Sequence, residues 1–454
     1  MENDEAVVDC CRTQEVCKVY GTASRGVAAP STRIQKYTNQ TLPLLQNQNE
    51  YGLGLDILMV ADYSTYQGFI EIAGGDLNMG QLYTHEYLRA VFEQVKTIYT
   101  HIKIAKQTIH LNLVDSFVTF RENDCPIMFH SNETIEDNNF NSTLSNNTIL
   151  FNFDINYENS TELTLTMPAS EALDKFSQWR TRNKLYLPKY DHAVLITKYD
   201  LLSSRGESST QGLAYVGNIC QLDGSDSIVE DIGAAATAVV VAHELGHSLG
   251  AFHDGNLESK ECLSSENFLM ATTVSGTEDD ELFAHSRVMS PCSLRNIENK
   301  LNTSSFDCVR KIHHSNPKLR NKSSIELPQT PGERFGLRQQ CQIAFGPHYG
   351  ICPNKEYFRD VDICRRVWCK DRTKPRNEPC ETKTYFPALD GTECDKIKWC
   401  MAGRCIDNPK RLSECVDLNA KTCQMYSKVK LRHYCKSKQF TEICCRSCVL
   451  LKSF

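Results

Sequence analysis

The 454-residue sequence lacks an apolar run long enough to cross a bilayer. Its longest apolar stretch, Ile232 to Ala242, has eleven residues, whereas a membrane-spanning helix needs about 20. It also lacks an excess of positive charge. The net charge of −6 at pH 7 argues against a nucleic-acid binder held by phosphate contacts. Residues 1–29 contain no apolar signal-peptide core, and we interpret this as a missing start rather than as a cytosolic origin.

Cysteine, in contrast, is abundant at 22 residues. Eight cysteines fall between Cys341 and Cys405, and six between Cys415 and Cys448. Dense clusters of even number are typical of small extracellular modules that disulfides hold together. A cytosolic zinc-finger protein is the alternative, but paired CxxC knuckles are absent and histidine is scarce in both clusters. The sequence therefore predicts a secreted protein, and Asn-X-Ser/Thr sequons agree with export: Asn39, Asn132, Asn141, Asn146, Asn159, Asn302 and Asn321.

The order of the apolar segments predicts an α/β domain with buried strands that alternate with helices. Strands are expected at 55–60, 109–114 and 192–197, and helices at 87–105 and 168–183. The Asn-rich residues 131–162 are expected to form a surface insertion.

One segment carries the chemistry. His243 and His247 are four residues apart, so they project from one face of the helix that the apolar residues before them predict. Two imidazoles on one face can hold one Zn²⁺ at about 2.0–2.1 Å. Gly250 lets the chain leave the helix, so that His253 can return as a third ligand. Three ligands leave one zinc position open for water, which is the catalytic arrangement.

Glu244 adjoins the first ligand and is expected to act as the general base. Bound zinc lowers the pKa of water to about 7. Glu244 would accept the proton of that water during attack on a peptide carbonyl and return it to the leaving amine.

The elongated motif resembles the zinc signature of the metzincins, and Asp254 after the third histidine resembles the adamalysin, or reprolysin, branch. This resemblance implies a twisted, mostly parallel sheet with an active-site helix. It also implies a methionine beneath the zinc, for which Met270 is the candidate and Met289 the second choice.

The resemblance also implies two disulfides and a calcium site. Relatives would join Cys220 with Cys308 and Cys262 with Cys292. They also bind Ca²⁺, with ligands that correspond to Asp56 and Asp191. Where the family has Asn or Asp, this sequence has Lys311, so the calcium site departs from the family pattern.

The two cysteine clusters resemble known modules. Residues 331–405 are similar to the disintegrin-like module of ADAMTS proteases, without an Arg-Gly-Asp triplet. The final six cysteines, which end in Cys444-Cys445-Arg446-Ser447-Cys448, resemble a PLAC module. Residues 410–454 carry ten Lys or Arg and three Asp or Glu. This basic module is a candidate surface for glycosaminoglycans or matrix, or simply a solvated face.

The predicted organisation is an N-terminal segment at 1–50, a protease domain at 51–311, a linker at 312–330 and two small disulfide-rich modules at 331–408 and 409–454. The N-terminal segment is interpreted as the remnant of a propeptide, in which Cys17 either occupies the zinc position or joins a disulfide. The predicted function is a secreted zinc metalloendopeptidase of extracellular or matrix proteins. The alternatives are a host-directed, venom-type protease and a non-catalytic binding protein with a protease-like domain.

Overall fold

The computed structural model describes residues 7–11, 53–128, 166–221, 225–310, 329–353 and 362–451. The predicted insertion, residues 312–328 of the predicted linker and Cys17 lie outside these residues. Within them, no helix combines the length and the apolar character that crossing a membrane requires.

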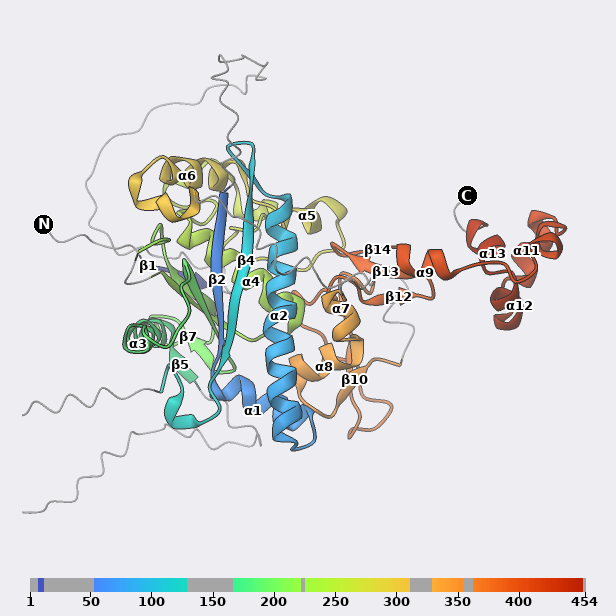
Figure 1. Ribbon diagram of the computed structural model, residues 1–454, viewed down its shortest axis with the longest axis horizontal. Coiled ribbons are helices and arrows are strands. Elements are labelled where there is room, and N and C mark those ends of the chain that lie inside the picture. Colours follow the sequence, from blue (N-terminus) through green and yellow to red (C-terminus); the bar gives the residue numbers. More distant parts are fainter. Residues whose placement is uncertain are drawn as a thin grey trace, which may run out of the picture.

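A largely parallel sheet forms the centre of the larger body (Figure 1). The sheet order is β3-β4-β2-β6-β9-β8-β7-β5, and β1 pairs with β8. Strand β2 runs parallel to β4 and β6, and β6 runs parallel to β9, whereas β8 is antiparallel to β9. The strands are β1 (Val7–Cys11), β2 (Leu53–Ala61), β3 (Lys103–Ile104), β4 (Gln107–Val118), β5 (Thr166–Pro168), β6 (His192–Thr197), β7 (Asp200–Leu202), β8 (Thr210–Tyr215) and β9 (Asp226–Glu230).

Helices cover both faces of this sheet, which explains why the central strands read as continuous apolar runs. In β2, Ile57 and Met59 belong to one hydrophobic cluster, while Leu58 and Val60 belong to another on the opposite face. The helices are α1 (Tyr63–Ile72), α2 (Leu77–His101), α3 (Ala169–Arg182), α4 (Ala234–Ser248), α5 (Asp280–His285) and α6 (Pro291–Leu301), with short 3₁₀ turns η1 (Glu122–Asp124), η2 (Leu257–Ser259), η3 (Ser264–Glu266) and η4 (Ser304–Arg310).

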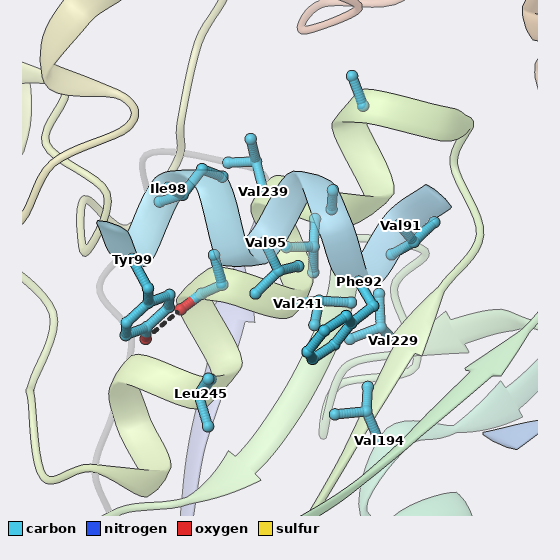
Figure 2. Close-up of a cluster of buried hydrophobic side chains, with 14 of the residues drawn as sticks. Val91, Phe92, Val95, Ile98, Tyr99, Val194, Val229, Val239, Val241 and Leu245 are labelled. Carbon is cyan, nitrogen blue, oxygen red and sulfur yellow. Dashed lines mark hydrogen bonds between the residues drawn. The ribbon is translucent and has the colours of Figure 1, made fainter. Parts of the chain in front are cut away.

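The long helix α2 packs against α4 through buried hydrophobic side chains (Figure 2). Val91, Val95 and Ile98 of α2 and Val239 and Val241 of α4 belong to the same buried cluster. The hydroxyl of Tyr99 also donates a hydrogen bond of 3.0 Å to the carbonyl of Ala242. These contacts fix α4 just before the motif that it carries.

The expected elements are present, with shifted ends. The predicted strand 192–197 coincides with β6, and the predicted helix 168–183 with α3. The helix expected at 87–105 instead spans Leu77–His101. It begins earlier because Asp76 caps it by accepting hydrogen bonds from the amides of Asn78 and Met79. It ends earlier because the chain turns into β3.

The cysteine-rich module continues the core of the larger body. Phe335, Cys341, Ile343 and Phe386 belong to the same buried cluster as α2 and α4. Four disulfides hold this module together: Cys341–Cys369, Cys352–Cys380, Cys364–Cys400 and Cys394–Cys405. Its elements are α7 (Pro331–Arg334), α8 (Leu337–Phe345), β10 (Tyr349–Ile351), β11 (Cys369–Asp371), β12 (Glu393–Asp395), β13 (Lys398–Met401) and β14 (Arg404–Asp407).

The last six cysteines form a separate helical module, which lies to one side of the body in Figure 1. Three disulfides cross-link it: Cys415–Cys445, Cys423–Cys444 and Cys435–Cys448. Its helices are α9 (Pro409–Glu414), α10 (Ala420–Gln424), α11 (Lys428–Tyr434), α12 (Lys438–Ile443) and α13 (Cys445–Leu450). Disulfides replace most of the core in a module of this size.

Candidate metal centre and active-site cleft

Helix α4 carries His243, Glu244 and His247, and all fifteen of its residues are buried. Its alanine- and valine-rich first half packs on α2, so the polar motif emerges from an otherwise apolar helix. After the C-cap residue Leu249, Gly250 has φ of 106°, in the left-handed region that favours glycine. The chain therefore turns back, as the sequence predicts, and places His253 against the helix.

The three histidines point their Nε2 atoms at one place. The Nε2 of His253 is 3.0 Å from that of His243 and 3.1 Å from that of His247. Three nitrogens around one Zn²⁺ at 2.0–2.1 Å would lie about 3.3 Å apart. The donor set is therefore of the right type and spacing for zinc.

The opposite ring nitrogens fix two of these imidazoles. The Nδ1 of His243 is 2.6 Å from the carbonyl of Leu269, and the Nδ1 of His247 is 2.8 Å from that of Ala251. A carbonyl accepts only, so each Nδ1 carries the proton and each Nε2 keeps its lone pair for a metal. Burial lowers the pKa of His243 to about 4, so the ring is neutral at pH 7.

The carboxylate of Glu244 faces strand β8. The glutamate is fully buried, and a Cβ built on Gly212 would lie 2.6 Å from its Oε1. Glycine at this position leaves room for the carboxylate between α4 and strand β8. Glu244, which follows His243 in α4, is thus held against β8 rather than in bulk water.

Two methionines lie under the helix. A Cβ on Gly246 would meet the Sδ of Met270 at 2.5 Å and the Cε of Met289 at 3.2 Å, so both candidates pack on the same glycine and Met270 is the nearer. Met270 is fully buried, and its carbonyl accepts a hydrogen bond of 2.9 Å from the amide of Asp254. The methionine turn and the third histidine are thus tied together.

Asp254 joins this turn to α6. Its Oδ1 accepts a hydrogen bond of 2.6 Å from the hydroxyl of Ser290, which also caps the start of α6. Burial raises the pKa of the Asp254 carboxyl to about 6, although the hydrogen bonds from Ser290 and Ser293 oppose this. Asp254 thus has a structural role here.

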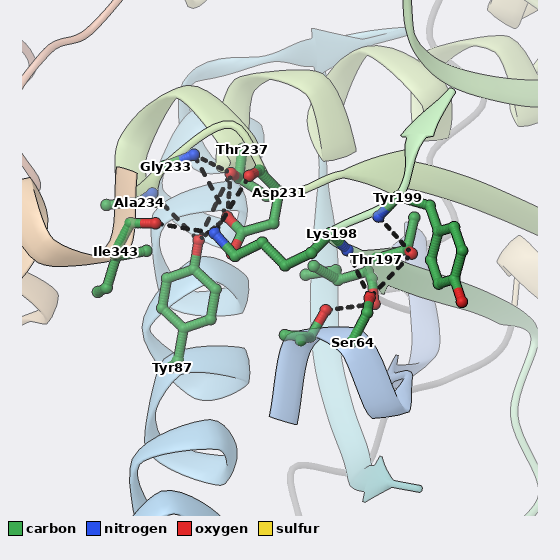
Figure 3. Close-up of polar contacts among 12 residues, drawn as sticks. Ser64, Tyr87, Thr197, Lys198, Tyr199, Asp231, Gly233, Ala234, Thr237 and Ile343 are labelled. Atoms are coloured by element: carbon green, nitrogen blue, oxygen red, sulfur yellow. Dashed lines mark hydrogen bonds and ion pairs between the residues drawn. The ribbon is translucent and has the colours of Figure 1, made fainter. Parts of the chain in front are cut away.

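A polar network fixes the first turn of α4 (Figure 3). The buried carboxylate of Asp231 accepts hydrogen bonds from Tyr87 and Thr237 and pairs with the Nζ of Lys198 at 2.8 Å. Lys198 also donates to the carbonyl of Ile343 at 2.8 Å. One lysine therefore connects the start of α4 with the cysteine-rich module.

Two disulfides and one pair of calcium ligands were also expected from the sequence. The structure joins Cys220 with Cys308 and Cys262 with Cys292. Asp56 and Asp191 are adjacent, since the Oδ2 of Asp191 accepts a hydrogen bond of 2.9 Å from the amide of Asp56. Lys311 lies outside the described residues, and calcium at this pair stays a prediction.

Sequence reasoning did not identify several residues of the site. Gly212, Ser290 and the carbonyls of Leu269 and Ala251 all act on the motif from elsewhere in the fold. For Gly212 and Ser290, no spacing signal in the sequence connects them with residues 243–254. The carbonyls carry no side-chain signal at all.

Comparison with known proteins gives two family matches. The Reprolysin (M12B) family zinc metalloprotease model matches residues 134–312, and the ADAMTS cysteine-rich domain 2 model matches residues 331–406. The chain is 31% identical over 261 residues to "A disintegrin and metalloproteinase with thrombospondin motifs 1" of Rattus norvegicus, covering 55% of this chain and 24% of that protein. It is 26% identical over 400 residues to "A disintegrin and metalloproteinase with thrombospondin motifs 20" of Homo sapiens, covering 86% of this chain and 17% of that protein.

The chain therefore spans about a quarter or less of the length of these curated relatives. Among solved structures, metalloproteinase-II from Bacteroides fragilis matches with 16% identity, 59% of this chain, 56% of that chain and a TM-score of 0.27. A score this low supports no further argument. The two family matches and the curated relatives show a reprolysin-type zinc metalloprotease domain followed by an ADAMTS cysteine-rich domain, and this arrangement is consistent with an ADAMTS-like metzincin.

Proposed function

We propose that the protein is a secreted zinc-dependent endopeptidase that hydrolyses peptide bonds of extracellular proteins. The observation that carries this proposal is the convergence of three Nε2 atoms, 3.0 and 3.1 Å apart, beside the buried carboxylate of Glu244. A binding protein with an inert protease-like domain would not need a base at this position. The names of the curated relatives, which describe metalloproteinases, support the same class of reaction.

His243, His247 and His253 would hold the zinc ion. Bound zinc supplies a Lewis acid that acidifies water and polarises the scissile carbonyl. We assign to Glu244 the role of accepting the proton that the attacking water loses, because this residue follows the proposed ligand His243 in α4 and is fully buried. It then delivers this proton to the nitrogen of the leaving amine, which would otherwise be a poor leaving group.

The test is peptide cleavage by the full chain and by Glu244→Gln, each with measured zinc content. Loss of the base should lower kcat by several orders of magnitude while zinc remains bound. A chelator should abolish cleavage by the wild type. Glu261→Gln, an exposed glutamate that pairs with Arg295 at the surface, is the matched control and should retain full activity. Cleavage that resists the chelator, or that persists undiminished in Glu244→Gln, would reject the proposal.

Secretion is supported by the nine disulfides among the described residues, since such density is typical of oxidising compartments. The proposed substrates are accordingly extracellular or matrix proteins. Asn302 of the predicted sequons is exposed at the end of α6, so it is accessible for glycosylation. Expression in a secretory host and mass spectrometry at Asn302 test both points.

The basic C-terminal module supports a second proposed contact, with sulfated glycosaminoglycans. Lys421, Lys430, Arg432 and Lys436 are exposed on its surface, and several cations on a small rigid module attract a polyanion. The double variant K430E/R432E should elute from immobilised heparin at lower salt than the wild type. Equal elution would assign these residues to an ordinary solvated face.

A further inference from the structure

A pocket of about 110 Å³ lies beside the metal ligand His243. Ala236, Val239, Val240 and His243 line it from α4, at the spacing of one helical stripe. From Ala236 to His243 this stripe is about 10 Å long at 1.5 Å per residue. The pocket therefore extends from the proposed zinc site along the helix and towards its first turn.

The cysteine-rich module provides another wall of this pocket. Lys383, Thr384 and Tyr385 line it together with residues 271–274, which follow Met270. Both family domains of the chain therefore meet in one cavity next to the catalytic centre.

Hydrogen bonds hold these two walls together. The amide of Gly276 donates to the carbonyl of Thr384 at 3.1 Å, and Arg366 donates to the carbonyl of Gly276 at 3.2 Å. The hydroxyls of Ser286 and Tyr385 are 3.1 Å apart. The Lys198 bridge to Ile343 (Figure 3) fixes the same module at the other end of α4. The pocket therefore has walls from two modules that hydrogen bonds join to each other.

The residues that line the pocket carry positive but no negative charge. None of the fourteen lining residues is acidic, and Lys383 is the one that carries a permanent charge. Its Nζ is 5.5 Å from the centre of the Phe345 ring. Much of the remaining lining of the pocket is apolar and consists of Ile232, Ala236, Val239, Val240, Ala271 and Val274. Apolar walls screen a charge poorly, so an ion that enters the pocket interacts strongly with Lys383.

We propose that Lys383, which the cysteine-rich module contributes, makes this side-chain pocket beside the proposed zinc site favour acidic substrate side chains over basic ones. The cysteine-rich module then determines specificity directly, from within the cleft. This inference rests on the proposed endopeptidase function, and it names the class of side chain that the pocket selects.

The experiment uses the full chain and peptides in which one position on either side of the cleaved bond carries Glu, Lys or Leu. The measured quantity is the ratio of kcat/KM for the Glu peptide to that for the Lys peptide. For the wild type we expect a ratio of at least about ten at one position. Lys383→Glu should invert this ratio, Lys383→Met should bring it near one, and Lys383→Arg should preserve it.

Lys396→Glu is the control, because Lys396 is exposed on the same module and does not line the pocket. It should leave the ratio at its wild-type value. A ratio near one in the wild type, or the same ratio in wild type, Lys383→Glu and Lys383→Met, would overturn the inference while leaving the protease intact. Absence of cleavage of every peptide, including those with Leu, would reject the proposed function itself and this inference with it.

Discussion

Gly212 of strand β8 lies directly against the carboxylate of Glu244. A Cβ on residue 212 would come 2.6 Å from Oε1, 2.8 Å from Cγ and 3.0 Å from Cδ of that glutamate. The requirement for glycine here comes from space and not from an unusual backbone angle. Strand β8 therefore determines where the proposed base can lie.

Gly212→Ala should lower kcat by about 10- to 100-fold, because the added methyl group displaces the Glu244 carboxylate. The zinc content should stay at one ion per chain, since the three atoms nearest to a Cβ on residue 212 all belong to Glu244. Steady-state kinetics with metal analysis tests this. Gly68→Ala is the matched control: a Cβ there meets nothing closer than the Cε of Lys198 at 3.7 Å. Full activity in Gly212→Ala would show that the base tolerates displacement.

Removal of the metal should destabilise the protein as well as inactivate it. Without a cation, three neutral nitrogens face one another in a buried site, and a metal that binds only the folded chain stabilises it by mass action. At a zinc concentration about 1,000 times Kd the gain is about 4 kcal/mol, which corresponds to roughly 10 °C in Tm. Calorimetry with and without a zinc chelator measures this shift. His253→Ala should show a much smaller one, and an equal shift in that variant would place the metal elsewhere.

Calcium is predicted to bind at Asp56 and Asp191, and its effect on stability can be measured separately from that of zinc. Ca²⁺ added to the zinc-loaded protein should raise Tm of the wild type, because two carboxylates are suitable ligands. Asp191→Asn should abolish this increase while retaining the hydrogen bond from the amide of Asp56, since the amide side chain keeps an acceptor oxygen. If Ca²⁺ raises Tm equally in both proteins, this pair is not the binding site.

The parts of the site that the sequence predicts are those that one short segment encodes. His243, Glu244, His247 and Gly250 owe their arrangement to one helix and its end, so residue spacing suffices. Gly212 and Lys383 come from other segments, and tertiary packing alone brings them to the cleft. The predicted ends of α2 were wrong for a related reason. Asp76 and the turn into β3 determine where the helix begins and ends, and neither changes the apolar periodicity of the sequence.

The attachment of the cysteine-rich module depends on the buried pair Arg287 and Asp390. Asp390 accepts hydrogen bonds from Arg287 at 3.4 Å and from Gln94 at 2.8 Å. Asp390→Ala leaves the guanidinium buried without this carboxylate, which should reduce the free energy of unfolding by about 3–5 kcal/mol. Denaturant unfolding under non-reducing conditions measures the loss. Glu393→Ala breaks the exposed pair with Arg411 and should cost less than about 1 kcal/mol; similar losses in both variants would contradict this view of the interface.

Lys198→Met should make the stability gap to the wild type depend on pH. Burial alone raises the pKa of Asp231, and pairing with Lys198 and hydrogen bonds from Tyr87 and Thr237 outweigh it, so the pKa lies below its ordinary value of 3.8. In the wild type, this group therefore stabilises the fold above about pH 4, and the contribution is lost as the pH falls through the folded pKa. Without the lysine, burial dominates, the pKa rises above 3.8, and the ionised carboxylate destabilises the fold as the pH increases.

The difference in unfolding free energy between wild type and Lys198→Met should therefore grow from pH 4 to pH 7, because the other titrating groups cancel in the comparison. Lys175→Met removes the surface pair with Glu171 and should give a small difference at both pH values. A gap of the same size at pH 4 and pH 7 would mean that Lys198 acts mainly through its hydrogen bond to Ile343. The ratio of kcat/KM for the Glu and Lys peptides would distinguish the ion pair with Asp231 from the hydrogen bond to Ile343. The hydrogen bond to Ile343 fixes the module that contributes Lys383, so its loss should change this ratio.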